Sequence, residues 1–225
     1  MSAATAHLKA DLRYVTADGE EISTTLGAVD EGRLSTALPM RKFYAHARQR
    51  HYSGLFWSAT TGDHVPYESR LEMDRLWFAD FDPTLSWISA QPMRLSGNDG
   101  EASRRHVPDF LLTHTDGTLT VVDVKPREFA RHPKAAAVFA WTQALCSTRG
   151  WSYEIWHGGD PIVLANIKFS AIARRRYPNA PLRHESPPSP GGTTVESLHD
   201  ALQAVWSGEH PVELDVPLNR SSLVR

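Results

Sequence analysis

Two stretches in the middle of the chain alternate hydrophobic and polar residues, as β-strands with two different faces do. They cover residues 106–114 and 118–125. Residues 67–83 instead repeat hydrophobic positions at helical spacing, and Asp82-Pro83 ends that run. The remaining predicted elements are a hairpin over 11–26, strands over 85–95 and 151–158, a polar loop over 96–103, helices over 132–150 and 160–176, and a short helix within 193–211.

The two central strands are joined by a turn that ends at Gly117, a residue that readily adopts a positive φ. A three-residue turn pairs His114 with Thr118. Counting outward along both strands then sets Asp109 opposite Asp123. A loop one residue longer or shorter moves the two carboxylates to a diagonal relation or to opposite faces, so their proximity depends on this register.

The order of predicted elements is helix, three strands, helix, strand, helix. A hairpin in the middle argues against a purely parallel sheet, so we expect an α/β fold with a mixed central sheet flanked by helices. Three regions are predicted: a basic and aromatic N-terminal extension over 1–59, the main domain over 60–177, and a Pro-rich linker with a short helix and tail over 178–225.

Composition narrows the possible functions. The 225 residues are 41% hydrophobic with a formal net charge of −2, which gives no overall attraction to nucleic acid or to membranes. The single cysteine, Cys146, excludes an internal disulfide and a cysteine-cluster zinc site. The N-terminus has no apolar signal segment and no apolar run is long enough to cross a bilayer, so a cytoplasmic protein is expected.

Two carboxylates at cross-strand distance repel each other, and a divalent cation between Asp109 and Asp123 would remove the conflict. Hard oxygen ligands without sulfur or a histidine cluster indicate Mg²⁺ or Mn²⁺. Lys125 lies on the same strand face as Asp123, where its ammonium can hold a water or stabilise developing phosphate charge. This chemistry suits phosphodiester hydrolysis. The alternative is an ordinary edge hairpin with solvated charges.

A further carboxylate is expected from the helix over 67–79, where Glu68 and Glu72 stand four residues apart on one face. Either residue fits, and surface glutamates on helices are usually solvated. His106, three residues before Asp109, is interpreted as a surface or core histidine, with support of the acidic site as the alternative.

These motifs together resemble a known family. A helix with glutamate, then VPDF (107–110), then DVKP (123–126) on the next strand resembles the PD-(D/E)xK nucleases, which share a restriction-endonuclease-like αβββαβ core. More narrowly, the stretch resembles TnsA-type endonuclease subunits of heteromeric transposases. There, a Ser-x-Leu-Glu helix is followed about nineteen residues later by Gln, as Glu72 is followed here by Gln91.

The resemblance implies a role for each matching residue. Glu72, Asp109 and Asp123 would bind Mg²⁺ or Mn²⁺, and Lys125 would be the catalytic lysine. Asp123 departs from the Glu or Gln that is usual at its position. The implied activity is cutting one strand of DNA at transposon ends, with a DDE-type transposase as partner and a regulatory AAA+ ATPase as a further one. The alternatives are a standalone restriction or repair nuclease, and a catalytically inactive DNA-binding or partner-binding module.

Local basic residues are the candidates for contact with the DNA backbone. Residues 40–57 interleave basic and aromatic side chains, although an amphipathic segment with a solvated basic face has the same pattern. Arginines at the end of the helix over 160–176 also complement the helix dipole. The candidates are Arg41, Lys42, Arg48, Arg50, Arg104, Arg105, Lys134 and Arg174 to Arg176.

Overall fold

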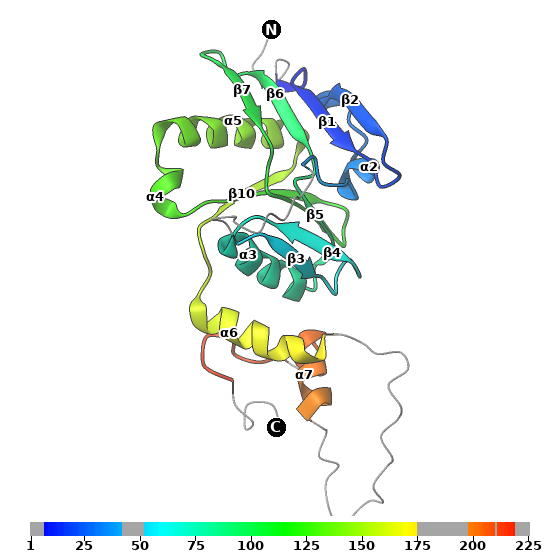
Figure 1. The fold of residues 1–225 in the computed structure, drawn as a ribbon, viewed down its shortest axis with the longest axis vertical. Coiled ribbons are helices and arrows are strands. Elements are labelled where there is room, and N and C mark those ends of the chain that lie inside the picture. The colour runs from blue at the N-terminus through cyan, green and yellow to red at the C-terminus, as the bar shows by residue number, and fades with distance from the viewer. Residues whose placement is uncertain (1–6, 42–51, 175–197, 210, 219–225) are drawn as a thin grey trace, which may run out of the picture. The chain divides into compact units, whose positions relative to one another are not determined.

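The computed structural model describes residues 7–41, 52–174, 198–209 and 211–218 (Figure 1). The chain divides into two compact units, Met1–Gly158 and Gly159–Arg225, and each is described by itself. The protein is a mixed α/β protein with three sheets in the described residues. In the same residues, no helix is long and apolar enough to cross a membrane.

A four-stranded mixed sheet forms the centre of the first unit, with strand order β10-β9-β8-β5. Strands β5 and β8 are antiparallel, as are β8 and β9, whereas β9 and β10 run parallel. The predicted mixed sheet is therefore confirmed. Its strands are β5 (Leu85–Ala90), β8 (Phe110–His114), β9 (Leu119–Val124) and β10 (Ser152–Trp156).

The β8–β9 hairpin has the predicted register. The backbone N–H of His114 donates to the carbonyl of Thr118 over 2.9 Å, which closes a three-residue turn. Phe110 is then paired with Val122, and the next step outward sets Asp109 opposite Asp123. Gly117 has the positive φ, 86°, that this turn requires.

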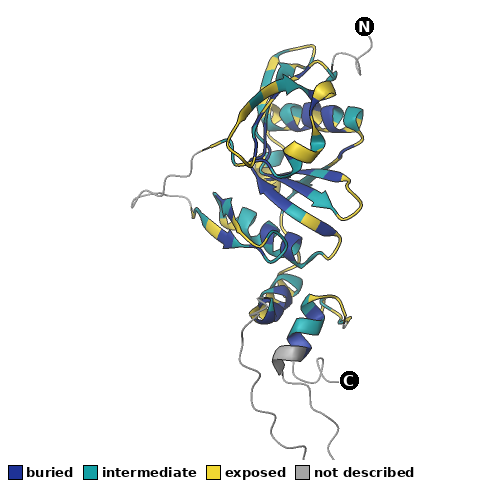
Figure 2. Ribbon diagram, turned by 90° about the vertical axis from the view of Figure 1, so that its right-hand side faces the viewer, coloured by how far each residue is buried: buried dark blue, intermediate teal, exposed yellow. Residues whose placement is uncertain are grey.

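Helices cover both faces of this sheet. In Figure 1, α5 (Pro133–Arg149) lies along one side and α3 (Arg70–Phe81) along the other. One buried cluster joins α5 to one face and includes Leu12, Leu95, Leu111, Val121, Trp141 and Leu145. The other joins α3 to the opposite face and includes Phe56, Leu76, Ala79, Phe110, Leu112 and Val122. Figure 2 shows the same distribution, with buried residues concentrated on the strands and on the inner faces of the helices.

A second sheet has the order β2-β1-β6-β7, and it corrects two predictions. The hairpin over 11–26 is confirmed. The strand predicted over 85–95 is confirmed over Leu85–Ala90, but its predicted end is wrong, because the chain leaves the central sheet there and enters the second sheet at Arg94. Residues 96–103 are not simply a loop, since they lie within a second hairpin. The strands are β1 (Asp11–Val15), β2 (Glu21–Thr25), β6 (Arg94–Asn98) and β7 (Ser103–His106).

Short elements complete the first unit. A two-stranded antiparallel sheet pairs β3 with β4 and contributes to the core beside α3. The carboxylate of Asp80, buried on α3, accepts hydrogen bonds from Ser58 and from the backbone of Thr60, which ties α3 to the segment after β3. The elements are η1 (Leu26–Ala28), α2 (Glu31–Ser35), β3 (Gly54–Trp57), β4 (His64–Tyr67) and α4 (Arg127–Ala130).

Helix α5 begins and ends as its sequence predicts. Pro133 occupies the first turn, where its missing N–H costs no hydrogen bond. Gly150 follows the last turn with φ 75°, and its N–H and that of Trp151 donate to carbonyls of that turn. The helix therefore stops just before β10.

The second unit contains α6 (Pro161–Ser170), η2 (Ala171–Ala173) and α7 (Leu198–Trp206). Asp160 caps α6, as predicted, by accepting from the N–H groups of Ile162 and Val163. Leu202 and Val205 of α7 are buried, in agreement with the predicted apolar face. The side chain of Asn166 on α6 donates to the carbonyls of Leu214 and Val216. These bonds attach the segment after α7 to α6.

Candidate functional site

A cavity of about 420 Å³ is lined by residues at the ends of three strands of the central sheet and by the first turn of α3. Gln91 follows β5, Asp109 precedes β8, and Asp123 belongs to the end of β9. Glu72 reaches the cavity from α3, and Lys125 from the residue after β9. The four residues predicted to be catalytic are therefore brought to one cavity.

Asp109 is held by the backbone of the neighbouring strand. The N–H of Val124 donates to its Oδ2 over 2.7 Å. The pKa of Asp109 is raised to about 8, chiefly by burial and also by the nearby charges of Glu72 and Asp123, while the Val124 hydrogen bond and Lys125 act in the opposite direction. The protein alone therefore supplies too little positive charge to keep this carboxyl ionised at neutral pH.

Glu72 caps its own helix. Its Oε2 accepts from the N–H of Glu68 over 2.7 Å and its Oε1 from the hydroxyl of Ser69 over 2.8 Å, while its own N–H donates to the Ser69 hydroxyl. This reciprocal arrangement is similar to a capping box, with the N–H of Glu68 and the hydroxyl of Ser69 in place of the Ser69 N–H. Burial raises the pKa of Glu72, and the hydrogen bonds from Glu68 and Ser69 oppose the shift.

Glu68 and Glu72 do not share a helix, which corrects the predicted arrangement. Helix α3 begins at Arg70 with Ser69 as its N-cap, so Glu68 precedes it. The Glu68 side chain remains 42% exposed, and its Oε2 lies 3.5 Å from Nη1 of Arg41. Both glutamates line the cavity, but only Glu72 lies within α3, and it is the better candidate for the helix position.

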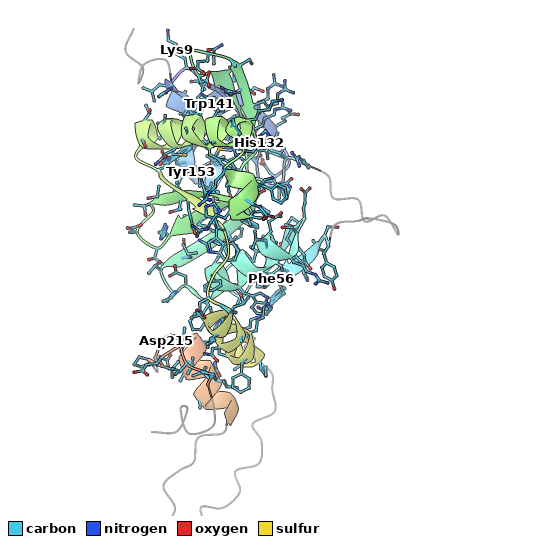
Figure 3. The ribbon with its side chains drawn as sticks, turned by 90° about the vertical axis from the view of Figure 1, so that its left-hand side faces the viewer. Lys9, Phe56, His132, Trp141, Tyr153 and Asp215 are labelled. Carbon is cyan, nitrogen blue, oxygen red and sulfur yellow. The ribbon has the colours of Figure 1, made fainter. Side chains whose placement is uncertain are left out.

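Asp123 is the most enclosed of the acidic residues, with 2% of its surface exposed. The hydroxyl of Tyr153 donates to its Oδ2 over 2.5 Å, and Nε2 of His106 lies 2.9 and 2.8 Å from its two oxygens. Figure 3 labels Tyr153 on β10, beside α5. Burial raises the pKa of the Tyr153 phenol, and the charge of Asp123 and its hydrogen bond with the hydroxyl raise it as well.

Lys125 is exposed at the mouth of the cavity. Its backbone N–H donates to the carbonyl of Trp156, and Nδ1 of His157 donates to its carbonyl over 2.7 Å. The first bond continues the β9–β10 pairing past the end of the strand, and the second ties the Lys125 carbonyl to a side chain. The backbone is thus fixed while the ammonium lowers the pKa of Glu72 and of Asp109.

The oxygen donors of the cavity suit a hard divalent cation. The described residues contain no group of three His, Cys, Asp or Glu side chains already set to hold a metal ion. Glu72, Asp109 and Asp123 nevertheless line one cavity, and the buried Oε1 of Gln91 has no hydrogen-bond partner. A carboxyl with a raised pKa and a buried oxygen without a donor are both features that a cation would compensate.

The candidate DNA-binding residues lie in different parts of the structure, and only some of them line the cavity. Arg41 and Arg105 line the cavity, whereas Arg104 forms an ion pair with Asp99 over 2.5 Å. Lys134 is exposed in the first turn of α5. In the second unit, the Arg174 guanidinium lies 5.9 Å from the ring centroid of Trp206. Lys42, Arg48, Arg50, Arg175 and Arg176 lie outside the described residues.

Two further residues contact Asp123. His106 was interpreted as a surface or core histidine, with support of the acidic site as the alternative, and the contact with Asp123 favours the alternative. Tyr153 was assigned only to a strand. Its position follows from the parallel pairing of β10 with β9, in which Tyr153 is opposite Val121 and so lies on the Asp123 face. That pairing carries no local sequence signal.

No protein-family model matches the chain, and no curated protein matches it significantly.

Proposed function

We propose that this protein is a divalent-metal-dependent DNA endonuclease with a restriction-endonuclease-like core, acting as the strand-cutting subunit of a heteromeric transposase. One observation carries the proposal: Glu72, Asp109, Asp123 and Lys125, which come from three separate elements, line a single cavity. Surface charges without a common role have no reason to gather in this way at the ends of strands.

The arrangement of elements supports the same class. Helix α3, strands β5, β8 and β9, helix α5 and strand β10 follow the αβββαβ order, with the β6–β7 hairpin inserted after β5. The sheet order and the parallel β9–β10 pair agree with a mixed sheet between two helices. The acidic residues lie at one end of this sheet, beside the first turn of α3.

Each residue has a separate task in the proposed reaction. Glu72, Asp109 and Asp123 would hold Mg²⁺ or Mn²⁺, which when bound activates water and neutralises the scissile phosphate. The exposed ammonium of Lys125 would orient the attacking water and stabilise charge on the phosphate oxygens. Arg41 and Arg105 would hold the flanking phosphates at the cavity mouth. The raised pKa of Asp109 adds support, since a cation would bring this carboxyl back to its ionised form.

The proposal is tested by Mg²⁺-dependent nicking of transposon-end DNA, with a DDE-type transposase partner supplied in the same reaction. The substitution Asp109→Asn keeps the shape of the side chain and removes its charge, so nicking is expected to fall at least a hundredfold. Asp116→Asn, in the exposed β8–β9 turn, is the matched control and should nick normally. Full nicking by Asp109→Asn would overturn the proposal.

Cleavage of DNA without transposon ends, by the purified chain alone, would instead favour a standalone restriction or repair nuclease.

A catalytically inactive binding module is the second candidate function, and a specific observation favours it. All three carboxylates already accept hydrogen bonds from the protein: Glu72 from Ser69, Asp109 from Val124, and Asp123 from Tyr153. Calorimetry with Mn²⁺ distinguishes the inactive module from the proposed endonuclease, because an inactive module would bind DNA but no metal. A regulatory ATPase partner remains part of the proposal and is tested by co-purification.

A further inference from the structure

Gln91 combines two unfavourable features at the edge of the cavity. Its backbone has φ 44°, the only positive φ of a non-glycine residue in the described part of the chain. Left-handed backbone at a long side chain costs free energy and persists only where the surroundings enforce it. The residue is also 4% exposed, and its Oε1 is buried without a hydrogen-bond partner.

The backbone of Gln91 is fixed from both sides. Its N–H donates to the carbonyl of Asp109 over 2.8 Å, and its carbonyl accepts from the N–H of Met40 over 3.0 Å. The chain changes sheets at this point, since β5 ends at Ala90 and β6 begins at Arg94. The strained conformation thus couples Gln91 directly to the backbone of Asp109 and holds its side chain at the cavity.

The chemistry of the cavity defines what the unpaired oxygen can bind. An amide oxygen accepts hydrogen bonds or binds cations, and it does not bind a phosphate oxygen. Glu72, Asp109 and Asp123 in the same cavity are oxygen acceptors when ionised. A neutral oxygen adds a ligand without adding to the repulsion among these carboxylates. Carbonyl oxygens of this kind are ordinary ligands of hard divalent cations.

We propose that Oε1 of Gln91 is a neutral ligand of the divalent cation in this cavity, and that the left-handed backbone at residue 91 holds it there. The inference rests on the proposed metal site and assigns it one more residue. It also gives the strained backbone a role, because a relaxed residue at this position would leave the side chain free to turn away.

The test is Mn²⁺ binding to the full chain, measured by calorimetry, together with thermal melts in chelator. The substitution Gln91→Gly removes the oxygen and fits the positive φ, so the melting temperature should stay equal or rise. Mn²⁺ affinity should fall on the order of tenfold, the lower range for loss of a supporting group at a metal site. Gln91→Glu retains an oxygen at the same reach. Its Mn²⁺ affinity should stay within about threefold of wild type and exceed that of Gln91→Gly.

Two reference variants make the outcomes distinct. Gln143→Gly on α5, where the side chain is exposed, controls for loss of a glutamine and should leave Mn²⁺ affinity unchanged. Asp109→Asn should abolish binding. If wild type binds Mn²⁺, Asp109→Asn does not, and Gln91→Gly binds as wild type does, the role of Gln91 is wrong while the metal site stands. If wild type binds no Mn²⁺, both proposals are overturned.

Discussion

The imidazole Nε2 of His106 lies 2.9 and 2.8 Å from the two carboxylate oxygens of Asp123. His106 ends β7 in the second sheet, whereas Asp123 belongs to β9 in the central sheet, so the contact joins the two sheets beside the cavity. Tyr153 adds a hydrogen bond from β10. Asp123 is therefore oriented by side chains from two other strands before any ligand binds.

The first prediction concerns this orientation. Tyr153→Phe removes one donor from a buried carboxylate, and leaving a buried charged acceptor short of a partner costs about 1–3 kcal/mol of unfolding free energy. Urea denaturation measures the loss. Tyr52→Phe is the control, since Tyr52 is 59% exposed, and it should change stability by less than about 0.5 kcal/mol. Equal effects of the two substitutions would show that the hydrogen bond to Asp123 contributes nothing.

A second prediction separates the structural role of Glu72 from its proposed catalytic role. Ser69→Ala removes the N-cap of α3 and should destabilise the protein by about 1 kcal/mol while strand nicking continues in the folded fraction. Glu72→Gln retains an oxygen for the capping box but removes the charge. It should melt within a few degrees of wild type yet nick at least tenfold more slowly. Normal nicking by Glu72→Gln would leave Glu72 as a capping residue only.

The pH dependence of stability follows from Asp109. Its pKa is raised from the ordinary 3.8 to about 8, so between these values the native state keeps a proton that the unfolded state has lost. Stability is full below pH 3.8 and falls as pH rises toward 8, by up to ~1.4 kcal/mol per pH unit from this group. Urea denaturation in chelator, across this range, should show a shallower fall for Asp109→Asn than for wild type.

The control for this measurement is Asp116→Asn. Asp116 is exposed in the β8–β9 turn, where the hydroxyl and N–H of Thr118 lower its pKa. Its contribution to stability is therefore lost only on strong acidification, opposite in direction to that of Asp109. Asp116→Asn should leave the fall between pH 3.8 and 8 unchanged. Identical profiles for Asp109→Asn and wild type would contradict the assignment of this fall to Asp109.

The sequence predicted the parts of the fold that depend on neighbouring residues. The turn at Gly117 has a local signal, and it determined the register that sets Asp109 opposite Asp123. The polar residues of 96–103 gave no such signal, because the β6–β7 hairpin is stabilised by pairing with β1, which belongs to the same sheet but lies far away in the sequence. The break after Ala90 was missed for the same reason: a left-handed glutamine is enforced by tertiary contacts rather than by local propensity.

The candidate site was also predicted only where neighbouring residues determine it. Asp109, Asp123 and Lys125 were found because they lie on one hairpin with a countable register. Glu68 and Glu72 could not be separated until Ser69 was located as the N-cap, which places only Glu72 in the helix. Tyr153 depends on a parallel pairing between strands that are separated by a whole helix. Such non-local contacts cannot be read from periodicity.

The last prediction compares two adjacent arginines on β7. Arg105 lines the cavity, whereas Arg104 is paired with Asp99 in the turn of the same hairpin. Each phosphate contact contributes about 0.9 to the slope of log affinity against log salt concentration, so Arg105→Ala should reduce that slope by about one unit. Arg104→Ala should change the slope much less, because its charge is already neutralised. Fluorescence anisotropy with duplex DNA at several salt concentrations measures both slopes, and equal slopes for the two variants would remove Arg105 from the DNA-binding surface.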